Sequence, residues 1–503
     1  MRLLDTSTLA LHYFAADPPP YAILSHTWGD EEVGFQEWQA REGHPSIKAK
    51  EGFQKVRSFC RKACMVGYKW GWADTCCIDK SSSAELSESI NSMFRWYRAS
   101  SVCFVHLSDV SEKRIALGSE FANTRWFTRG WTLQELIAPE DVVFYNRDWI
   151  HMGTKRDHCK IISQLAGIDH ENLVDFEPDN SVSMACRISW ASKRQTTRPE
   201  DTAYCLMGIV GVNMPLLYGE GHNAFQRLQE EIIKVSDDHS LFAWSPLTQF
   251  SRYLPHSYRG VLAEYPRQFS SDVIHGRPTG GFHYWRTSYM MTNKGLQIKL
   301  PLVPSETSST IYYGILDCIV RKRSIDHTSY GVGVPLVCIS DDGTQFARVE
   351  NRSLKTFDFS RRQTEGLIRQ IYVRQHDKSI IVIPENWLYR SRDDEVASFS
   401  RIVSGQSIGE VDDPHCETIR TITVEIIVLC CLYIFHSAIL NLMDRFAHTE
   451  VASTHRCMPT TTILISILVY VYLRPHFRRL PRPFGEGRGS LGPIRRFVDR
   501  RWL

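Results

Sequence analysis

The pattern of hydrophobic and polar positions over the first 245 residues alternates between two kinds of segment. Short, almost wholly apolar runs are typical of strands that are buried on both faces of a sheet. Apolar residues at helical spacing, as from Phe53 to Cys64 and from Leu86 to Tyr97, are typical of helices with one buried face. The strand candidates are residues 21–25, 72–78, 102–107 and 142–145. Strands that alternate with helices predict a mainly parallel sheet covered by helices, an α/β domain.

Capping residues mark where the helices of this region begin. Ser82 and Glu85 have the spacing of a capping box, which satisfies the free N–H groups at a helix start. The segment 125–137 is a further helix candidate, and a proline two residues later excludes its continuation. The last part is mostly helical and ends with a helix over 225–235. We therefore expect residues 1–245 to form one α/β domain with a helical extension.

Residues 255–410 change to a strand-like pattern. Leu296, Ile298 and Leu300 alternate with polar residues, which is the period of a strand with one buried face. The sequence Asp-Asp-Gly-Thr at 341–344 lies between two apolar runs and is typical of a hairpin turn. Further short strand candidates are residues 371–373 and 380–383. This segment is predicted to be a β-rich accessory region.

Two uncharged runs follow near the C-terminal end, at residues 426–443 and 457–473. A membrane-spanning helix needs about 20 apolar residues, with about 17 as the lower limit. Arginines follow the second run directly, as is typical of the cytoplasmic side of a membrane helix. We expect a transmembrane helical hairpin over 422–473 and an Arg-rich tail over 474–503. The alternative is a pair of buried helices that belong to the β-rich region.

Composition excludes several classes of protein. The chain has 503 residues, and a single core stops growing at roughly 250–300 residues, so we expect two domains and extra segments. A hydrophobic fraction of 43% and a charged fraction of 23% exclude a disordered, collagen-like or coiled-coil chain. From Asp444 onward, 11 Lys and Arg stand against 4 Asp and Glu. Such a basic tail suits a membrane surface or nucleic acid, of which we expect the membrane.

Common motifs for metal and nucleotide chemistry are missing from the sequence, including the Walker loop, the His-Glu-x-x-His helix and the Gly-x-Ser-x-Gly elbow. Fourteen cysteines are too few for a disulfide scaffold. Adjacent Cys76 and Cys77 are expected to be buried free thiols rather than zinc ligands. We therefore expect no metal site, no resident cofactor and a reducing, cytosolic compartment.

The first candidate binding site is the polar loop that follows the first predicted strand. Its side chains include Ser25, His26, Trp28 and Asp30. In open parallel sheets, ligands bind beyond the C-terminal ends of the strands. A tryptophan among polar groups can stack on a base and orient a ribose there. The alternative is a solvated loop in which Trp28 folds back over the core.

The second candidate is the segment that contains Trp131 and Glu135. The two residues are four apart, so a helix places them on the same face. A carboxylate beside an indole is partly desolvated, which raises its pKa and strengthens its interaction with a cation. The alternative is an ordinary helix with one buried tryptophan and one exposed glutamate.

Several long motifs, in order along residues 1–245, resemble the fungal heterokaryon-incompatibility (HET) domain. They are residues 20–32 (PYAILSHTWGDEE), 72–79 (WADTCCID), 89–97 (SINSMFRWY), 129–139 (RGWTLQELIAP), 198–209 (RPEDTAYCLMGI) and 217–225 (LYGEGHNAF). The resemblance implies a role in non-self recognition between fungal strains that ends in regulated cell death. The β-rich region and the hydrophobic tail lie outside it.

The HET domain in turn is remotely similar to Toll/interleukin-1-receptor (TIR) domains, which have a flavodoxin-like order of strands and helices. Some TIR domains hydrolyse NAD at the nicotinamide bond. This resemblance implies that Glu135 is the catalytic carboxylate. It also implies that Ser25, His26, Trp28, Asp30 and Trp131 surround NAD as a substrate.

Three functions remain open at this point. The first is a death-triggering NAD hydrolase. The second is a non-enzymatic module that signals by assembling with partners. The third is a membrane-disrupting protein whose effector is the C-terminal hairpin. The expected partners are an unidentified non-self protein, further copies of the chain and a membrane. The expected location is the cytoplasmic face of that membrane.

Overall fold

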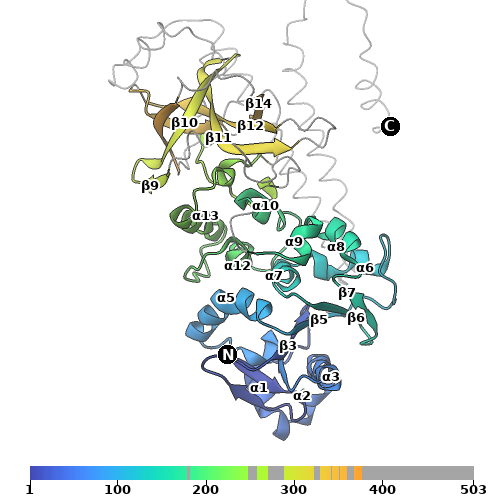
Figure 1. Ribbon diagram of the computed structural model, residues 1–503. Coiled ribbons are helices and arrows are strands. Elements are labelled where there is room, and N and C mark those ends of the chain that lie inside the picture. Colours follow the sequence, from blue (N-terminus) through green and yellow to red (C-terminus); the bar gives the residue numbers. More distant parts are fainter. Residues whose placement is uncertain are drawn as a thin grey trace, which may run out of the picture. The chain divides into compact units, whose positions relative to one another are not determined.

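The computed structural model describes residues 1–177, 182–246, 258–269, 288–306, 308–321, 329–340, 342–349, 352–358 and 368–375 (Figure 1). All described residues lie in one compact unit of the chain. The predicted strand at 380–383, the hairpin at 422–473 and the tail at 474–503 lie outside the described residues. Within the part described, no helix has the length and apolar character needed to cross a bilayer.

The N-terminal region is a seven-stranded mixed sheet in the order β2-β1-β4-β3-β5-β6-β7. The strands are β1 (Arg2–Asp5), β2 (Leu11–Tyr13), β3 (Tyr21–His26), β4 (Trp70–Trp72), β5 (Val102–Leu107), β6 (Val142–Asn146) and β7 (His151–Thr154). The four central strands, β4, β3, β5 and β6, are parallel, and the outer strands pair antiparallel. The predicted parallel core is therefore confirmed, with antiparallel edges added.

Helices cover both faces of this sheet, as expected for strands that are apolar throughout. Helix α3 (Glu51–Met65) packs on one face, where the ring of Phe59 meets that of Phe104 on β5. Helices α5 (Ser83–Arg98) and α7 (Thr132–Ile137) lie on the other face. On that face the Cys103 thiol of β5 reaches the backbone carbonyl of Glu135 at 3.8 Å. Neighbouring residues of one strand point to opposite faces, which separates the side chains at the sheet edge into two groups.

The strand predicted over residues 72–78 is wrong for most of its length. Strand β4 ends at Trp72, and helix α4 (Asp74–Cys77) follows after one extended residue. The carboxylate of Asp74 in the first turn favours a helix start, because it interacts with the positive end of the helix dipole. Both cysteines of this helical turn are buried. A short buried turn and a short buried strand have the same apolar pattern, which explains the wrong prediction.

The helix predicted over residues 125–137 is interrupted. A 3₁₀ helix, η2 (Arg125–Thr128), is separated from α7 by extended backbone at Arg129. There the Gly130 N–H donates to the carbonyl of Gln195 at 2.9 Å, and the Gln195 N–H donates to Thr128 at 2.7 Å. A β-carbon on Gly130 would lie 2.5 Å from the side chain of Thr196. Because Gly130 has no side chain, the segment around Gln195 can pair with the chain there. This pairing interrupts the helix predicted over 125–137.

The predicted cap of α5 is confirmed in one half. The Ser82 side chain accepts from the N–H of Glu85 at 3.3 Å. The Glu85 carboxylate turns away from Ser82, accepts from the N–H of Asp79 at 2.8 Å, and pairs with Arg2 of strand β1. The acidic cap residue thus joins the helix start to the outer part of the sheet.

The helical extension predicted after the sheet is present. It comprises α8 (Cys159–Ala166), α9 (His170–Val174), α10 (Met184–Ser189), α11 (Asp201–Tyr204), α12 (Met207–Val210), α13 (Asn223–Val235) and the 3₁₀ helix η3 (His239–Phe242). The remaining short helices are α1 (Phe35–Ala40), η1 (Arg41–Gly43), α2 (Pro45–Ala49), α6 (Glu120–Asn123) and η4 (Pro266–Phe269). Helix α13 confirms the periodic apolar pattern at 225–235.

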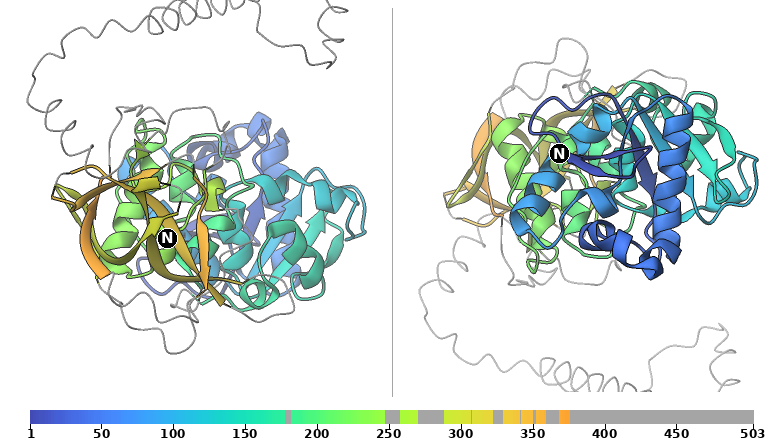
Figure 2. Two further views of the ribbon diagram at one scale, coloured as in Figure 1. Left: turned by 90° about the horizontal axis from the view of Figure 1, so that it is seen from above. Right: turned by 90° about the horizontal axis from the view of Figure 1, so that it is seen from below.

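The β-rich region forms a small barrel. Its strands are β8 (Tyr258–Arg259), β9 (Met290–Thr292), β10 (Gly295–Ser305), β11 (Ser308–Arg321), β12 (Ser329–Cys338), β13 (Gln345–Val349), β14 (Lys355–Asp358) and β15 (Ile368–Val373). Strands β12, β11, β10, β15 and β13 are paired in turn, and pairing of β13 with β12 closes the ring. The yellow and orange strands curve around a common interior in Figure 2. The hairpin predicted at 341–344 joins β12 to β13.

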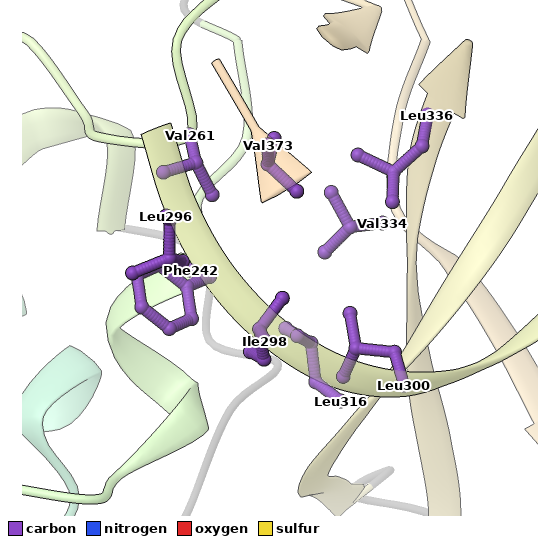
Figure 3. Close-up of a pocket in the computed structure, with 9 residues that line it drawn as sticks. All are labelled: Phe242, Val261, Leu296, Ile298, Leu300, Leu316, Val334, Leu336 and Val373. Atoms are coloured by element: carbon purple, nitrogen blue, oxygen red, sulfur yellow. The ribbon is translucent and has the colours of Figure 1, made fainter. Parts of the chain in front are cut away.

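The described side chains that line the space inside the barrel are apolar. Alternate residues of β10 point inward, as the period of two predicts, and the side chain of Phe242 from η3 enters the same space (Figure 3). The lining consists of Phe242, Val261, Leu296, Ile298, Leu300, Leu316, Val334, Leu336 and Val373. Only a narrow gap separates these side chains, so this space is a packed core that offers a ligand no polar partner.

The buried side chain of Arg348 on β13 holds the end of the helical extension against the barrel. Its guanidinium donates to the carbonyl of Phe242 at 2.7 Å and to that of Trp244, and it lies 3.4 Å from the centre of the Trp244 ring. Gln229 of α13 adds a reciprocal pair of hydrogen bonds with the backbone of Ala263. These contacts attach the barrel to helices that follow the sheet.

Candidate functional site

Polar side chains gather where the C-terminal ends of β3 and β5 meet. Among the parallel strands, the chain passes from β3 to β4 on one side of it. It then returns to β5 and β6 on the other side of β3, so the strand order reverses between β3 and β5. Open α/β sheets bind ligands in the crevice beyond this reversal. His26 of β3 lies beside His106 of β5 in register.

Glu135 of α7 reaches the end of β3 from one face of the sheet. The hydroxyl of Ser25 donates to the Glu135 carboxylate at 2.5 Å, and the indole N–H of Trp126 donates to the Ser25 oxygen at 2.8 Å. All three residues are buried, with 7% of Glu135 exposed. The hydrogen-bond chain fixes the carboxylate in one orientation at the strand end.

Burial, hydrogen bonds and nearby charges together set the protonation of this carboxyl group. Burial raises the pKa of Glu135 to about 8, the hydrogen bond from Ser25 opposes that rise, and the nearby Asp74 adds to it. The Arg194 guanidinium favours the ionised form. One of its nitrogens donates to the carbonyl of Arg129 at 2.8 Å and to the Thr132 hydroxyl at 2.9 Å, at the start of α7.

The raised pKa of Glu135 makes stability depend on pH. An unfolded chain keeps this proton only up to about pH 4.5, whereas the folded protein keeps it to about 8. The stabilisation is therefore complete below pH 4.5 and is lost as the pH rises through 8, by about 1.4 kcal/mol for each pH unit. We expect the free energy of unfolding of the native protein to fall relative to that of Glu135→Gln over this window, as measured by urea denaturation at pH 5.5, 6.5 and 7.5. Parallel pH profiles for the two proteins would contradict the assignment.

On the opposite, α3 face of the sheet edge, His26 lies between two carboxylates. Its Nε2 atom is 3.8 Å from Glu32 Oε1 and 3.9 Å from Asp74 Oδ1. Burial lowers the pKa of His26 well below its usual value, and Lys55 acts in the same direction, so the ring is neutral. The Glu32 carboxylate is itself held by Lys55 of α3 and by the N–H of Gly29 at 2.8 Å.

The remaining sequence candidates occupy different surroundings. Trp28 is 49% exposed, its indole N–H donates to Asp74 at 3.0 Å, and the Lys80 ammonium lies 3.6 Å from its ring centre. Asp30 is exposed in the same loop. Trp131 is half-buried and hydrogen-bonds to the Asp201 carboxylate, so its polar edge is directed to α11. The structure thus brings Ser25 to Glu135, and His26 and Trp28 to Asp74.

Sequence reasoning missed three residues of this edge. The helix predicted over 125–137 includes Trp126, the strand predicted over 72–78 includes Asp74, and no prediction is made for Arg194. Pairing of the chain at Gln195 and the end of β4 at Trp72 bring these residues to the sheet edge, and neither feature can be predicted from local spacing. Asp74 lies in the motif at 72–79 and Glu135 in the motif at 129–139. Membership of a long motif was the signal in the sequence that could have pointed to Asp74.

The glycines at 219 and 221 do not form an open anion site. Their N–H groups donate to the Glu200 carboxylate at 2.8 and 3.0 Å. This loop is therefore closed by a side chain of the protein itself. Among the described residues, no group of three or more His, Cys, Asp or Glu side chains has an arrangement suited to a metal ion.

Comparison with known proteins finds similarities in two segments of the chain. Residues 21–122 match the heterokaryon incompatibility protein (HET) family, and residues 223–279 match a domain of unknown function (DUF8212). Over 225 residues, the chain is 47% identical to vegetative incompatibility protein HET-E-1 of Podospora anserina. That stretch is 43% of this chain but 16% of the relative, so the chain spans only a small part of the relative's length. No solved structure matches the chain.

The part of the sheet that lies within residues 21–122, strands β3, β4 and β5, is therefore similar to a heterokaryon-incompatibility domain. This match agrees with the resemblance that the long motifs predicted, and the barrel follows the matched region in the sequence.

Proposed function

We propose that this chain acts in vegetative incompatibility, where non-self recognition leads to regulated cell death through hydrolysis of NAD at Glu135. The identity to an incompatibility protein supports the first part. The second part rests on one observation, the buried Glu135 held by Ser25 at the reversal point of a parallel sheet. The parallel strand order is compatible with the flavodoxin-like arrangement of TIR domains.

Hydrolysis of NAD at the nicotinamide bond requires few catalytic groups from the protein. The bond between the ribose carbon and the pyridinium nitrogen breaks, nicotinamide leaves as a neutral ring, and water adds to the ribose carbon with release of a proton. No general acid is needed, because the leaving ring starts as a cation. An ionised Glu135 stabilises the positive charge that develops on the ribose, as a carboxylate does in glycoside hydrolysis. The cationic substrate ring itself favours the ionised carboxylate.

Burial of the site implies a closed resting form. Ser25 is fully buried and Glu135 nearly so, so a dinucleotide reaches the carboxylate only after side chains at the edge move. In this proposal the non-self partner supplies the free energy for opening, which keeps a toxic activity low until recognition. The test is nicotinamide release from NAD by the full chain, measured before and after the incompatibility reaction begins in cells that carry it. NAD that stays constant while cells die would exclude this mechanism.

The assembly hypothesis makes the opposite prediction for the same measurement. A module that signals only by binding partners needs the folded surface of the domain but not the charge of Glu135. Cell death that persists with folded Glu135→Gln would therefore favour assembly over hydrolysis.

We also propose that residues 422–473 anchor the chain to a membrane with both ends in the cytosol. The proposal rests on the two uncharged runs and the arginines after the second. The full chain is expected to stay in the membrane fraction after carbonate extraction, and a chain truncated at Arg420 is expected to leave it. A full chain that is found wholly in the supernatant would contradict the anchor.

A further inference from the structure

We propose that His26, Glu32 and Asp74 form a binding site for the vicinal hydroxyl groups of a ribose, so that the ligand of this edge is a ribonucleotide. The inference deepens the proposed function and rests on it, because NAD carries two such riboses. It concerns the α3 face of the edge, whereas Glu135 lies on the α5 and α7 face.

Unused hydrogen-bonding capacity points to this site. The His26 side chain is 2% exposed, and among the described residues its Nε2 atom has no hydrogen-bond partner. The same holds for Glu32 Oε2, which is also buried. Buried polar atoms are rarely left unpaired, because each loses its bonds to water. Two such atoms on neighbouring side chains, one of them 3.9 Å from the Asp74 carboxylate, therefore indicate a polar ligand.

Charge decides which polar ligand fits. Lys55 pairs with Glu32, and the Lys80 ammonium lies 3.5 Å from Asp74, so each carboxylate already has a cation. A cationic ligand would meet no net negative charge. A phosphate would meet two carboxylates and is disfavoured by repulsion. A ligand with neutral hydroxyl groups is the remaining possibility. A hydroxyl group donates to a carboxylate, and it either donates to or accepts from a neutral imidazole.

The spacing suits a hydroxyl group. The gaps of 3.8 and 3.9 Å from His26 Nε2 to the two carboxylates are too long for direct hydrogen bonds. An oxygen beside either line can lie at about 2.8 Å from both atoms, which is hydrogen-bond distance. Because a neutral ring nitrogen makes one hydrogen bond, one hydroxyl group bonds to His26 Nε2 and to one carboxylate, and the adjacent hydroxyl group donates to the other carboxylate.

Trp28 supplies a surface for the base that a ribose carries. Half of the residue is exposed, and its indole N–H fixes the ring next to Asp74. The Lys80 ammonium covers one face of the ring, so the opposite face is the surface for a base. Indole rings stack well on planar bases. Asp74 also acts electrostatically on Glu135, so the two carboxylates lie near the same end of the sheet.

The test compares ligands with and without the diol. Binding of AMP and of 2′,3′-dideoxy-AMP to the full chain is measured by calorimetry, for the native protein, Asp74→Asn and the control Glu31→Gln. Glu31 is the exposed neighbour in the same loop, so the control repeats the charge change outside the site. We expect loss of the diol to weaken binding to the native protein about 10-fold or more. Asp74→Asn should weaken AMP binding similarly and leave the dideoxy ligand unaffected.

Two results would overturn the proposal. One is equal affinity of the native protein for both ligands, including no measurable affinity for either, and the other is an equal loss for both ligands in Asp74→Asn. The ligand comparison on the native protein decides alone if Asp74→Asn fails to fold. Diol-dependent binding without NAD hydrolysis would retain this site and reject the proposed catalysis, whereas hydrolysis without diol-dependent binding would do the reverse.

Discussion

Glu135→Gln is expected to lower NAD hydrolysis by about 10²–10³-fold while the domain stays folded. Gln keeps the size of Glu and can still accept the hydrogen bond from Ser25, but it lacks the negative charge that stabilises the transition state. Loss of one preorganised electrostatic contact typically costs a factor of this size. The measurement is nicotinamide release by the full chain, with a thermal melt of each protein.

The matched control is Glu140→Gln, which removes a carboxylate from the exposed segment after α7. It should leave both turnover and melting unchanged. The native protein should also show kcat/KM that rises with pH towards about 8, because the free carboxyl group must lose its proton. A folded Glu135→Gln protein with undiminished turnover would show that Glu135 is structural.

Arg348→Ala is expected to destabilise the protein by about 3–5 kcal/mol. The substitution leaves the carbonyls of Phe242 and Trp244 without their donor and opens a cavity beside the Trp244 ring. An unsatisfied buried polar group costs about 1–3 kcal/mol, and a large-to-small change in a core adds a cavity cost. The fall should be visible in the melting temperature and in faster hydrogen exchange at residues 242–244.

The control here is Arg369→Ala, which removes an exposed arginine from β15 of the same barrel. It should shift the melting temperature little, because exposed substitutions usually change stability by less than about 0.5 kcal/mol. Equal shifts for the two variants would show that Arg348 does not hold the helices to the barrel.

The sequence predicted well those features that depend on local periodicity. The buried strands around Ile23 and Phe104, the helix capped by Ser82 and the alternation at Leu296 all follow from spacing along the chain. Ser25 and Glu135 could also be named, because both lie in long motifs. Their contact could not be derived, since it joins residues 110 positions apart.

Features set by distant pairing were out of reach. The break in the helix at Gly130 depends on Gln195, and closure of the barrel depends on pairing between β12 and β13. Arg348 illustrates the difficulty best. A lone arginine in a strand favours an exposed position, and only the two carbonyls contributed by another part of the chain explain its burial.

The order in which the barrel strands are paired has a consequence for biosynthesis. Strand β10 is completed by residue 305, but its partner β15 ends only at Val373, and β13 also pairs with β15. A nascent chain that has emerged from the ribosome only as far as β13 therefore presents strand edges without their final neighbour. Such edges are templates for aggregation. Prematurely terminated products that end between β13 and β15 should accumulate as insoluble material or be degraded, whereas products that extend past residue 375 can close the ring.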